Sequence, residues 1–142
     1  MILVDANLLL YAKISDYRQH SGARAWLDHK LSGPARVGIP WASALAFLRI
    51  STNSRLFPRP LAIRDAWTQV ESWLDRPQVW VPEPTERHRE VLDDLLRDSS
   101  IVGGLVTDAH LAALALEHGL TLCSTDGDFG RFRDLRWQNP LR

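Results

Sequence analysis

The chain begins with MILVDANLLLYAK (residues 1–13), in which a short apolar run meets an acidic residue and then continues as a helical pattern. Ile2-Leu3-Val4 is typical of a buried strand, and it ends at Asp5. Asn7 to Lys13 is typical of a short helix. A carboxylate directly after a buried strand is rarely a solvated surface group, so Asp5 is the first candidate for a functional residue.

Beyond this stretch, strand-like apolar runs alternate with segments of helical periodicity. Further strands are expected at Ala35–Ile39, Val79–Val81, Leu120–Cys123 and, at an edge, Leu135–Trp137. Further helices are expected at His20–Leu31, Trp41–Ser51, Leu61–Leu74, Thr85–Arg97 and Thr107–His118. Such alternation predicts an α/β fold with a mostly parallel sheet covered on both faces. The length of 142 residues suits one domain, residues 1–142.

The composition favours a globular protein without a membrane segment. Hydrophobic residues make up 45% and charged residues 24%, which allows a core and argues against disorder. No apolar run is long enough to cross a bilayer, and the first residues lack the basic region of a signal peptide. The single cysteine, Cys123, fits a reducing compartment, so we expect a cytoplasmic protein. The net charge of zero does not by itself indicate nucleic-acid binding.

Three further aspartates are placed so that they should meet Asp5. Asp126 and Asp128 follow the strand that ends at Cys123, and parallel strands share one carboxyl edge of the sheet. Asp108 stands at the beginning of the helix that leads into this strand. Such a helix runs antiparallel to its strand, so its N-terminus lies at the same edge. We therefore expect the four carboxylates to converge.

Converging carboxylates favour a bound metal ion. At about 5 Å and an effective dielectric constant near 20, each like-charged pair repels by about 3 kcal/mol. Mg²⁺ or Mn²⁺, hard ions with oxygen ligands, would remove this repulsion, activate a water molecule and stabilise charge on a phosphodiester. Each aspartate also has a structural alternative, because Asp108 is an acid at a helix N-terminus and Asp126 and Asp128 flank Gly127 in a turn.

Four motifs follow one another along the chain: Val4-Asp5-Ala6-Asn7-Leu8-Leu9, Phe47-Leu48-Arg49 with Thr52, Thr107-Asp108-Ala109-His110-Leu111-Ala112-Ala113-Leu114-Ala115, and Ser124-Thr125-Asp126-Gly127-Asp128-Phe129. In this order and at these spacings they resemble the motifs of PIN-domain ribonucleases, specifically the VapC toxins of bacterial toxin–antitoxin pairs. The resemblance covers nearly the whole chain. It implies a three-layer α/β/α sandwich, a Mg²⁺- or Mn²⁺-dependent endoribonuclease, and neutralisation by a small VapB antitoxin.

The resemblance also assigns roles to individual residues. Carried over by position, the catalytic and metal-binding aspartates are Asp5, Asp108 and Asp126, with Asp128 as a further metal ligand. Thr125 stands where a hydroxyl residue orients the nearby acid, and Asn7 is expected to brace Asp5 or simply to begin a helix.

Several other features bear on RNA and on partners. Three arginines near a proline-containing loop are candidates for binding the RNA backbone, with ordinary solvated side chains as the alternative: Arg49, Arg55 and Arg59. The resemblance, together with six tryptophans, leads us to expect a symmetric homodimer. The five histidines show no metal-binding spacing and are expected to be structural or on the surface.

One departure from the family pattern keeps two alternatives open. Many relatives have a glutamate three positions before the arginine of Phe47-Leu48-Arg49, and this chain has Ala46. The missing carboxylate would weaken metal binding or shift it onto Asp128, and Ser43 would reach the site only through a water. The chain would then be a weak or inactive PIN domain that binds RNA or protein. A phosphatase or phosphotransfer enzyme is disfavoured because no Asp-x-Asp motif follows the first strand.

Overall fold

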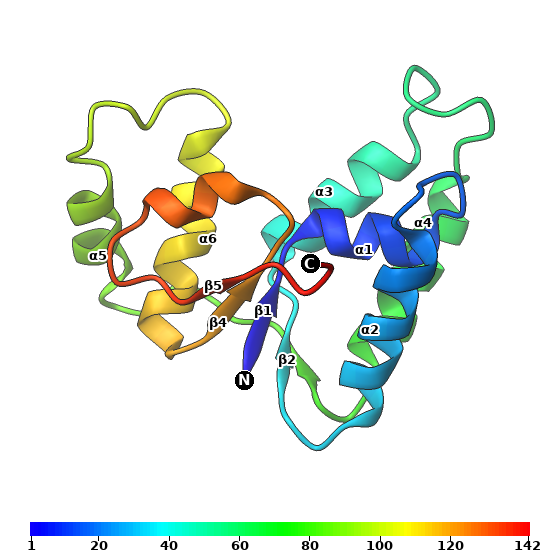
Figure 1. Cartoon of the computed structure of the whole chain (residues 1–142), viewed down its shortest axis with the longest axis horizontal. Coiled ribbons are helices and arrows are strands. Elements are labelled where there is room, and N and C mark those ends of the chain that lie inside the picture. Colours follow the sequence, from blue (N-terminus) through cyan, green and yellow to red (C-terminus); the bar gives the residue numbers. More distant parts are fainter.

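The strands form one parallel sheet with the first strand at its centre. They are β1 (Ile2–Val4), β2 (Val37–Gly38), β3 (Val79–Trp80), β4 (Thr121–Cys123) and β5 (Trp137–Gln138). The computed structural model describes residues 1–142, and the sheet order is β3-β2-β1-β4-β5 with every neighbouring pair parallel (Figure 1). The α/β fold with a parallel central sheet is therefore confirmed.

Helices cover both faces of this sheet. They are α1 (Ala6–Lys13), α2 (His20–Ser32), α3 (Trp41–Ser51), α4 (Ile63–Leu74), α5 (His88–Leu95), α6 (Leu105–His118) and the 3₁₀-helix η1 (Gly127–Arg131). Helices α1 to α4 pack on one face, and α5, α6 and η1 pack on the other (Figure 1). This arrangement is the three-layer sandwich that the resemblance implied. None of the helices combines the length and the apolar character needed to cross a membrane.

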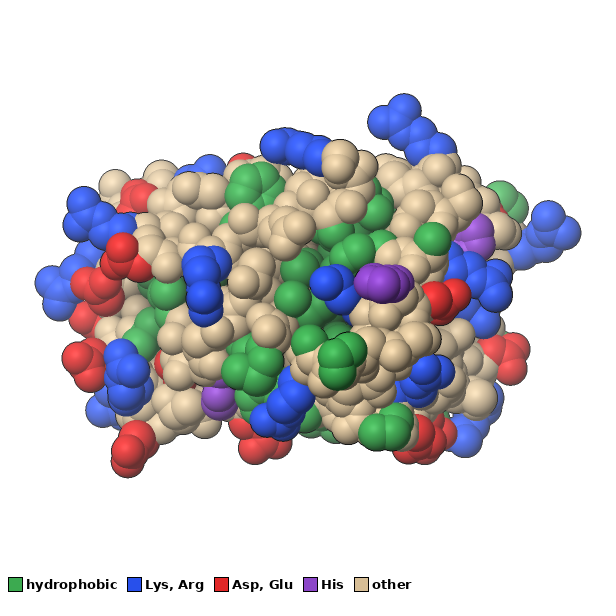
Figure 2. Space-filling model, turned by 60° about the horizontal axis from the view of Figure 1, so that its bottom comes forward, with side chains coloured by type: hydrophobic (Ala, Val, Ile, Leu, Met, Phe, Trp, Pro, Cys, Tyr) green, Lys and Arg blue, Asp and Glu red, His purple; other side chains and the backbone are tan.

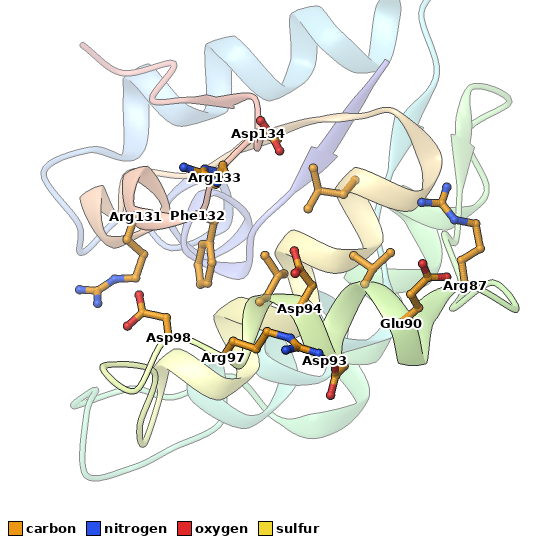
Figure 3. A pocket seen from close by; sticks show the side chains of 13 residues that line it. Arg87, Glu90, Asp93, Asp94, Arg97, Asp98, Arg131, Phe132, Arg133 and Asp134 are labelled. Carbon is orange, nitrogen blue, oxygen red and sulfur yellow. Dashed lines mark hydrogen bonds and ion pairs between the residues drawn. The ribbon is translucent and has the colours of Figure 1, made fainter.

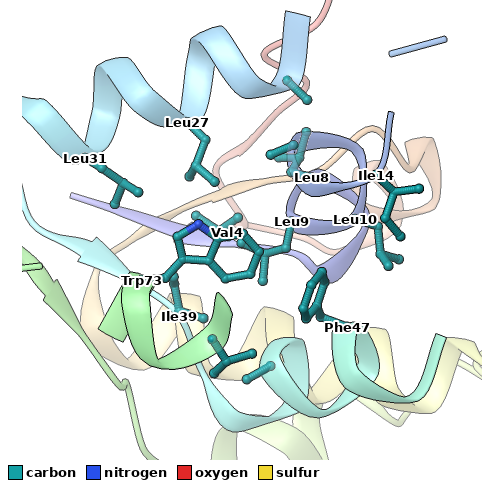
Figure 4. Close-up of a cluster of buried hydrophobic side chains, with 14 of the residues drawn as sticks. Val4, Leu8, Leu9, Leu10, Ile14, Leu27, Leu31, Ile39, Phe47 and Trp73 are labelled. Carbon is teal, nitrogen blue, oxygen red and sulfur yellow. The ribbon is translucent and has the colours of Figure 1, made fainter. Parts of the chain in front are cut away.

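Each face of the sheet has its own hydrophobic core, because successive strand residues point to opposite faces. In β1, Val4 joins the core beneath α1 to α4, and Leu3 joins the core beneath α6. In β4, Cys123 and Leu122 alternate in the same way. Figure 4 shows the first core, where Phe47 of α3 and other side chains from α1 to α4 meet over Val4. The two cores hold β1 and β4 in the register on which the site depends.

Two helices are shorter than the periodicity predicts. The helix expected at Thr85–Arg97 forms only as α5, and ahead of it the backbone N–H and hydroxyl of Thr85 donate to the Glu117 carboxylate at 2.9 and 2.7 Å. The helix expected at Leu61–Leu74 begins at Ile63, and ahead of it the N–H of Leu61 donates to the carbonyl of Ser51 at 2.9 Å.

Candidate active site

Asp5 lies at the carboxyl end of the central strand and begins the next helix. It is the N-cap of α1, with extended backbone angles, and its Oδ1 accepts a hydrogen bond from the N–H of Ala6 at 2.8 Å. Its Oδ2 accepts a hydrogen bond from the hydroxyl of Ser124 at 2.7 Å. Burial raises the pKa of Asp5, and the charge of Asp126 adds to this effect, while the two hydrogen bonds oppose it. The carboxylate is thus fixed from two sides.

Ser124 is the hydroxyl residue that orients Asp5. Because Val4 pairs with Cys123 in the parallel register, the residues after them, Asp5 and Ser124, stand next to each other. From the sequence, Thr125 was expected to orient a nearby acid, and that expectation stays a prediction. Thr125 lies one residue beyond the register position, and the hydroxyl that donates to Asp5 is that of Ser124.

Asn7 supports this arrangement through Ser124 and not by direct contact with Asp5. Its Nδ2 donates to the Ser124 hydroxyl oxygen at 3.1 Å, and that oxygen also accepts the N–H of Asp126 at 3.0 Å. The Oδ1 atom of Asn7 is buried and has no hydrogen-bond partner. A buried carbonyl oxygen without a donor is suited to accept a water molecule or a cation at the site.

Asp126 and Asp128 are held by the short helix that follows β4. Asp126 is the N-cap of η1, and its Oδ1 accepts the N–H of Asp128 at 2.9 Å. The turn expected at Asp126-Gly127-Asp128 is therefore the first turn of a 3₁₀-helix. Asp128 is the most open of the acids, with a side chain that is 54% exposed.

Asp108 lies in the first turn of α6 and completes the group of acids. Burial, together with the negative charges of the other three aspartates, raises its pKa to about 6. The structure thus brings all four predicted aspartates to one end of the sheet, close enough for their charges to act on one another. We call Asp5, Asp108, Asp126 and Asp128 the acid site.

The acid site has the donors for a hard divalent cation, although the side chains are not yet closed around one point. No group of three or more His, Cys, Asp or Glu side chains is placed so that it could hold a metal ion as it stands. The donor set nevertheless fits Mg²⁺ or Mn²⁺, because it consists of oxygens with unbalanced negative charge beside the unpartnered Oδ1 of Asn7.

Arg131 is the basic side chain at the acid site, and it was not predicted from the sequence. It is the last residue of η1, and its Nη2 lies 3.5 Å from Oδ1 of Asp128. Its positive charge lowers the pKa of Asp108, opposite to the effect of the aspartates. The sequence signal that could have identified Arg131 is its spacing of three residues from Asp128, because residues three apart are neighbours on a helix surface.

The residues expected on α3 and in the loop after it make no hydrogen bond or ion pair with the aspartates of the acid site. Ala46 is partly buried on α3, and the hydroxyl of Ser43 donates to the backbone carbonyl of Val4 at 2.7 Å and so does not reach an acid. Arg49 is exposed near the end of α3. Three arginines of this region are exposed, and none of them is among the charges that shift the pKa of Asp5 or Asp108: Arg49, Arg55 and Arg59.

The molecular surface gives RNA little overall attraction on the face shown in Figure 2. Basic and acidic side chains are interspersed there around a hydrophobic strip, with no field of one sign. This pattern agrees with the net charge of zero. This face, which lies toward the amino ends of the strands, therefore offers a polyanion no broad basic patch.

The fold and the acid site define a PIN domain. The chain matches the family described as PIN domain over residues 2–135, a range that contains all four aspartates of the acid site and Arg131. Ribonuclease VapC37 of Mycobacterium tuberculosis is 47% identical over 140 residues, which cover 99% of this chain and 97% of that protein. Ribonuclease VapC33 of the same organism is 39% identical over 142 residues, which cover 100% of this chain and 99% of that protein. The chain therefore belongs to the PIN-domain family, within its VapC group.

Solved structures show the same fold at lower sequence identity. VapC20 of Mycobacterium tuberculosis, described as a toxin that cleaves the sarcin–ricin loop, superposes with a TM-score of 0.68 at 20% identity, covering 96% of this chain and 99% of that one. VapBC-1 from nontypeable Haemophilus influenzae superposes with a TM-score of 0.69 at 18% identity over 100% of both chains. At these identities the likeness concerns the fold.

Proposed function

We propose that this protein is an endoribonuclease toxin that cuts RNA phosphodiester bonds with the help of Mg²⁺ or Mn²⁺. The observation that carries the proposal is the gathering of four carboxylates at the carboxyl end of a parallel sheet, with one arginine beside them. The full-length relatives named as ribonucleases support the same activity. Because RNA is the proposed substrate, the proposed site of action is the cytoplasm.

The residues of the acid site would hold the metal ion and orient the reactants. Asp5, Asp108 and Asp126 are the proposed catalytic ligands, with Asp128 as a fourth oxygen donor. When bound, the ion would lower the pKa of a water molecule and stabilise negative charge on the phosphate. Asp5 is already oriented by Ser124 and by the N–H of Ala6. In the free protein Asp108 holds a proton near pH 6, which must leave before its carboxylate binds a cation.

RNA cleavage by matched variants tests the proposal. Purified RNA should be cut in Mg²⁺ or Mn²⁺ and left intact in EDTA. Asp5→Asn and Asp108→Asn should each lower the rate by more than about 100-fold, because even losing an outer partner of a metal ligand costs about 10–100-fold. Asp65→Asn is the control, since Asp65 is an exposed acid in the first turn of α4. Parental rates in the Asp5 and Asp108 variants would refute the assignment.

A weak or inactive domain is the second candidate, and Ala46 on α3 is the observation that favours it. Such a protein would retain RNA or a partner protein without turnover. Ala46→Glu would add the carboxylate that relatives have near the site. If the parent chain binds RNA without cutting it and Ala46→Glu cuts it, the second candidate is correct. Cleavage by the parent chain at a rate that Ala46→Glu does not raise excludes it.

We further propose that a VapB-type antitoxin neutralises the toxin and that two copies of the chain form a homodimer. VapBC-1 is a toxin–antitoxin complex by its name, and its toxin chain has the same fold as this protein. For the homodimer, the outer side of α3 presents Trp41 and Leu45, which are 42% and 57% exposed. Arg49, Arg55 and Arg59 remain the proposed contacts for the RNA backbone away from the acid site.

A further inference from the structure

Arg131 makes the single ion pair of the acid site. Its Nη2 lies 3.5 Å from Oδ1 of Asp128, and the other ion pairs of the protein involve none of the four aspartates. An RNA strand that approaches the acid site therefore meets strong negative charge and one guanidinium group. Because like charges repel, a cationic protein group at this position would favour the approach of a phosphate.

A second contact fixes Arg131 from the loop between α5 and α6. Its Nη1 donates to the hydroxyl oxygen of Ser100 at 3.1 Å. That hydroxyl donates its own proton to Oδ1 of Asp98 at 2.7 Å, and the N–H of Ser100 donates to the same oxygen at 2.9 Å. The Ser100 oxygen is thus oriented to accept from the guanidinium. Two separate segments of the chain hold Arg131 in one position.

These contacts leave part of the guanidinium free. An arginine has five N–H donors in a planar fork; one N–H on Nη1 donates to Ser100, while the contact of Nη2 with Asp128 is an ion pair at 3.5 Å. The side chain of Arg131 is 31% exposed, so solvent reaches it. A fixed, partly exposed guanidinium is well suited to bind two oxygens of one phosphate.

The neighbouring cleft does not offer RNA a better path. It has a volume of about 770 Å³ and runs along α5, with Arg131 and Asp98 at one end and Arg87 at the other (Figure 3). Acidic side chains outnumber arginines among the residues that line it. The cleft therefore has no excess of positive charge with which to attract an RNA strand.

We infer that Arg131 binds a non-bridging oxygen of the RNA phosphate that occupies the acid site. This inference rests on the proposed ribonuclease function and adds to it a residue that recognises the substrate. The phosphate would take the donors that face solvent, while Ser100 and Asp128 keep the guanidinium in place. The alternative is that Arg131 only neutralises Asp128 and tethers the loop that contains Ser100.

A double-mutant cycle separates the two roles. Affinity for a fluorescein-labelled single-stranded RNA is measured by anisotropy over a series of KCl concentrations with Mg²⁺, in an Asp5→Asn background that binds without cutting. Arg131→Gln should weaken binding by about 10-fold and reduce the slope of log affinity against log salt by about 0.7. The same changes should appear when Asp128→Asn is also present. Arg97→Gln, an exposed arginine of the same cleft paired with Asp93, should change neither quantity.

The outcomes are distinct. If Arg131→Gln has no effect once Asp128→Asn is present, or if its affinity and slope equal those of the background, the inference is overturned. If Arg131→Gln fails to fold, Arg131→Lys is measured instead. A phosphate contact predicts that Arg131→Lys binds RNA more weakly with an unchanged salt slope. Affinity equal to that of the background would contradict the contact. Failure of the parent chain to cut RNA would overturn the proposed function, whatever the binding data show. Absence of RNA binding in the background would overturn the inference.

Discussion

At the scale of single residues, Ser124 connects more of the acid site than any aspartate does. Its hydroxyl donates to Asp5 and accepts from the side chain of Asn7 and the backbone of Asp126. The residue is fully buried, so its hydroxyl has no water as a substitute partner. The orientation of Asp5 therefore depends on a residue that carries no charge and binds no metal.

Replacing Ser124 should separate its role from that of the neighbouring hydroxyl. Ser124→Ala should lower RNA cleavage by about 10–100-fold, as expected for an outer partner of a metal ligand, and destabilise the fold by about 1–3 kcal/mol. Thr125→Ala should cleave at close to the parental rate. Cleavage rates at saturating metal and urea unfolding measure the two effects. Equal losses in both variants would contradict the assignment to Ser124.

The raised pKa of Asp108 means that the acid site destabilises the metal-free fold at neutral pH. Its pKa in the folded protein is raised from 3.8 to about 6, mainly by burial and then by the neighbouring carboxylates. An acid with a raised pKa stabilises the fold fully below its ordinary pKa, and this contribution is lost as pH rises through 6. At neutral pH the metal-free protein is therefore less stable than the same fold with a neutral side chain at this position.

Asp108→Asn should accordingly stabilise the metal-free protein while it abolishes activity. The gain should be about 1 kcal/mol above pH 6, after allowance for solvent screening of a half-exposed side chain, and it should vanish below the ordinary pKa of 3.8. Urea unfolding in EDTA, at a pH below 3.8 and at a pH above 6, measures this gain in the free energy of unfolding. A variant that is destabilised at neutral pH would show that the carboxylate is not under strain.

At the scale of elements, a buried carboxylate attaches α5 to α6. The side chain of Glu117 in α6 is 0% exposed and accepts from Thr85 and from Nδ1 of His88, the latter at 2.5 Å. His88 in turn hydrogen bonds through Nε2 to Nδ1 of His110 at 3.2 Å. Burial raises the pKa of Glu117, but hydrogen bonds from Thr85 and His88 outweigh it and leave the pKa below its ordinary value.

Glu117→Gln should loosen α5 and make the loss of stability in acid less steep. The lowered pKa means that Glu117 stabilises the fold above its ordinary value of 4.5 and loses this effect as pH falls through the folded value. We expect a loss of about 1–3 kcal/mol at neutral pH, since buried donors lose a charged acceptor. Glu71→Gln, on the exposed side of α4, is the control. Urea unfolding at neutral and acid pH, with hydrogen exchange of α5 amides, tests this.

At the scale of the whole molecule, the outer side of α3 is the apolar surface that a second copy would cover. Trp41 and Leu45 lie one helical turn apart, and Trp41 stacks on Trp67 of α4 with ring centroids 6.3 Å apart and planes inclined by 12°. The stacking fixes the indole of Trp41 although it is exposed. A rigid exposed aromatic surface loses little side-chain entropy on association.

Leu45→Lys should therefore convert the expected homodimer into monomers, because a charge would have to be buried at the interface. Leu56→Lys is the matched control, since Leu56 is equally exposed, at 58%, but lies in the loop after α3. Size-exclusion chromatography with light scattering gives the mass of each variant. A parental dimer that persists in Leu45→Lys would place the interface elsewhere.

The sequence by itself determined the layered α/β architecture and most of its elements. The apolar run Ile2-Leu3-Val4 and the helix at Trp41–Ser51 were predicted from local pattern, because burial on a sheet or a helix face leaves a period in the residues themselves. The meeting of Asp5 with Asp108 and Asp126 also followed from the chain, since parallel strands share a carboxyl edge whatever their exact length.

Only the tertiary structure decided which side chains support those acids. Ser124 meets Asp5 through the register of β1 and β4, and the contact of Arg131 with Ser100 joins residues 31 positions apart. The attachment of Thr85 to Glu117 likewise joins residues 32 positions apart. Pattern along the chain reports which face of an element is buried, whereas hydrogen-bond partners depend on distances of a few tenths of an ångström between elements that meet only after folding.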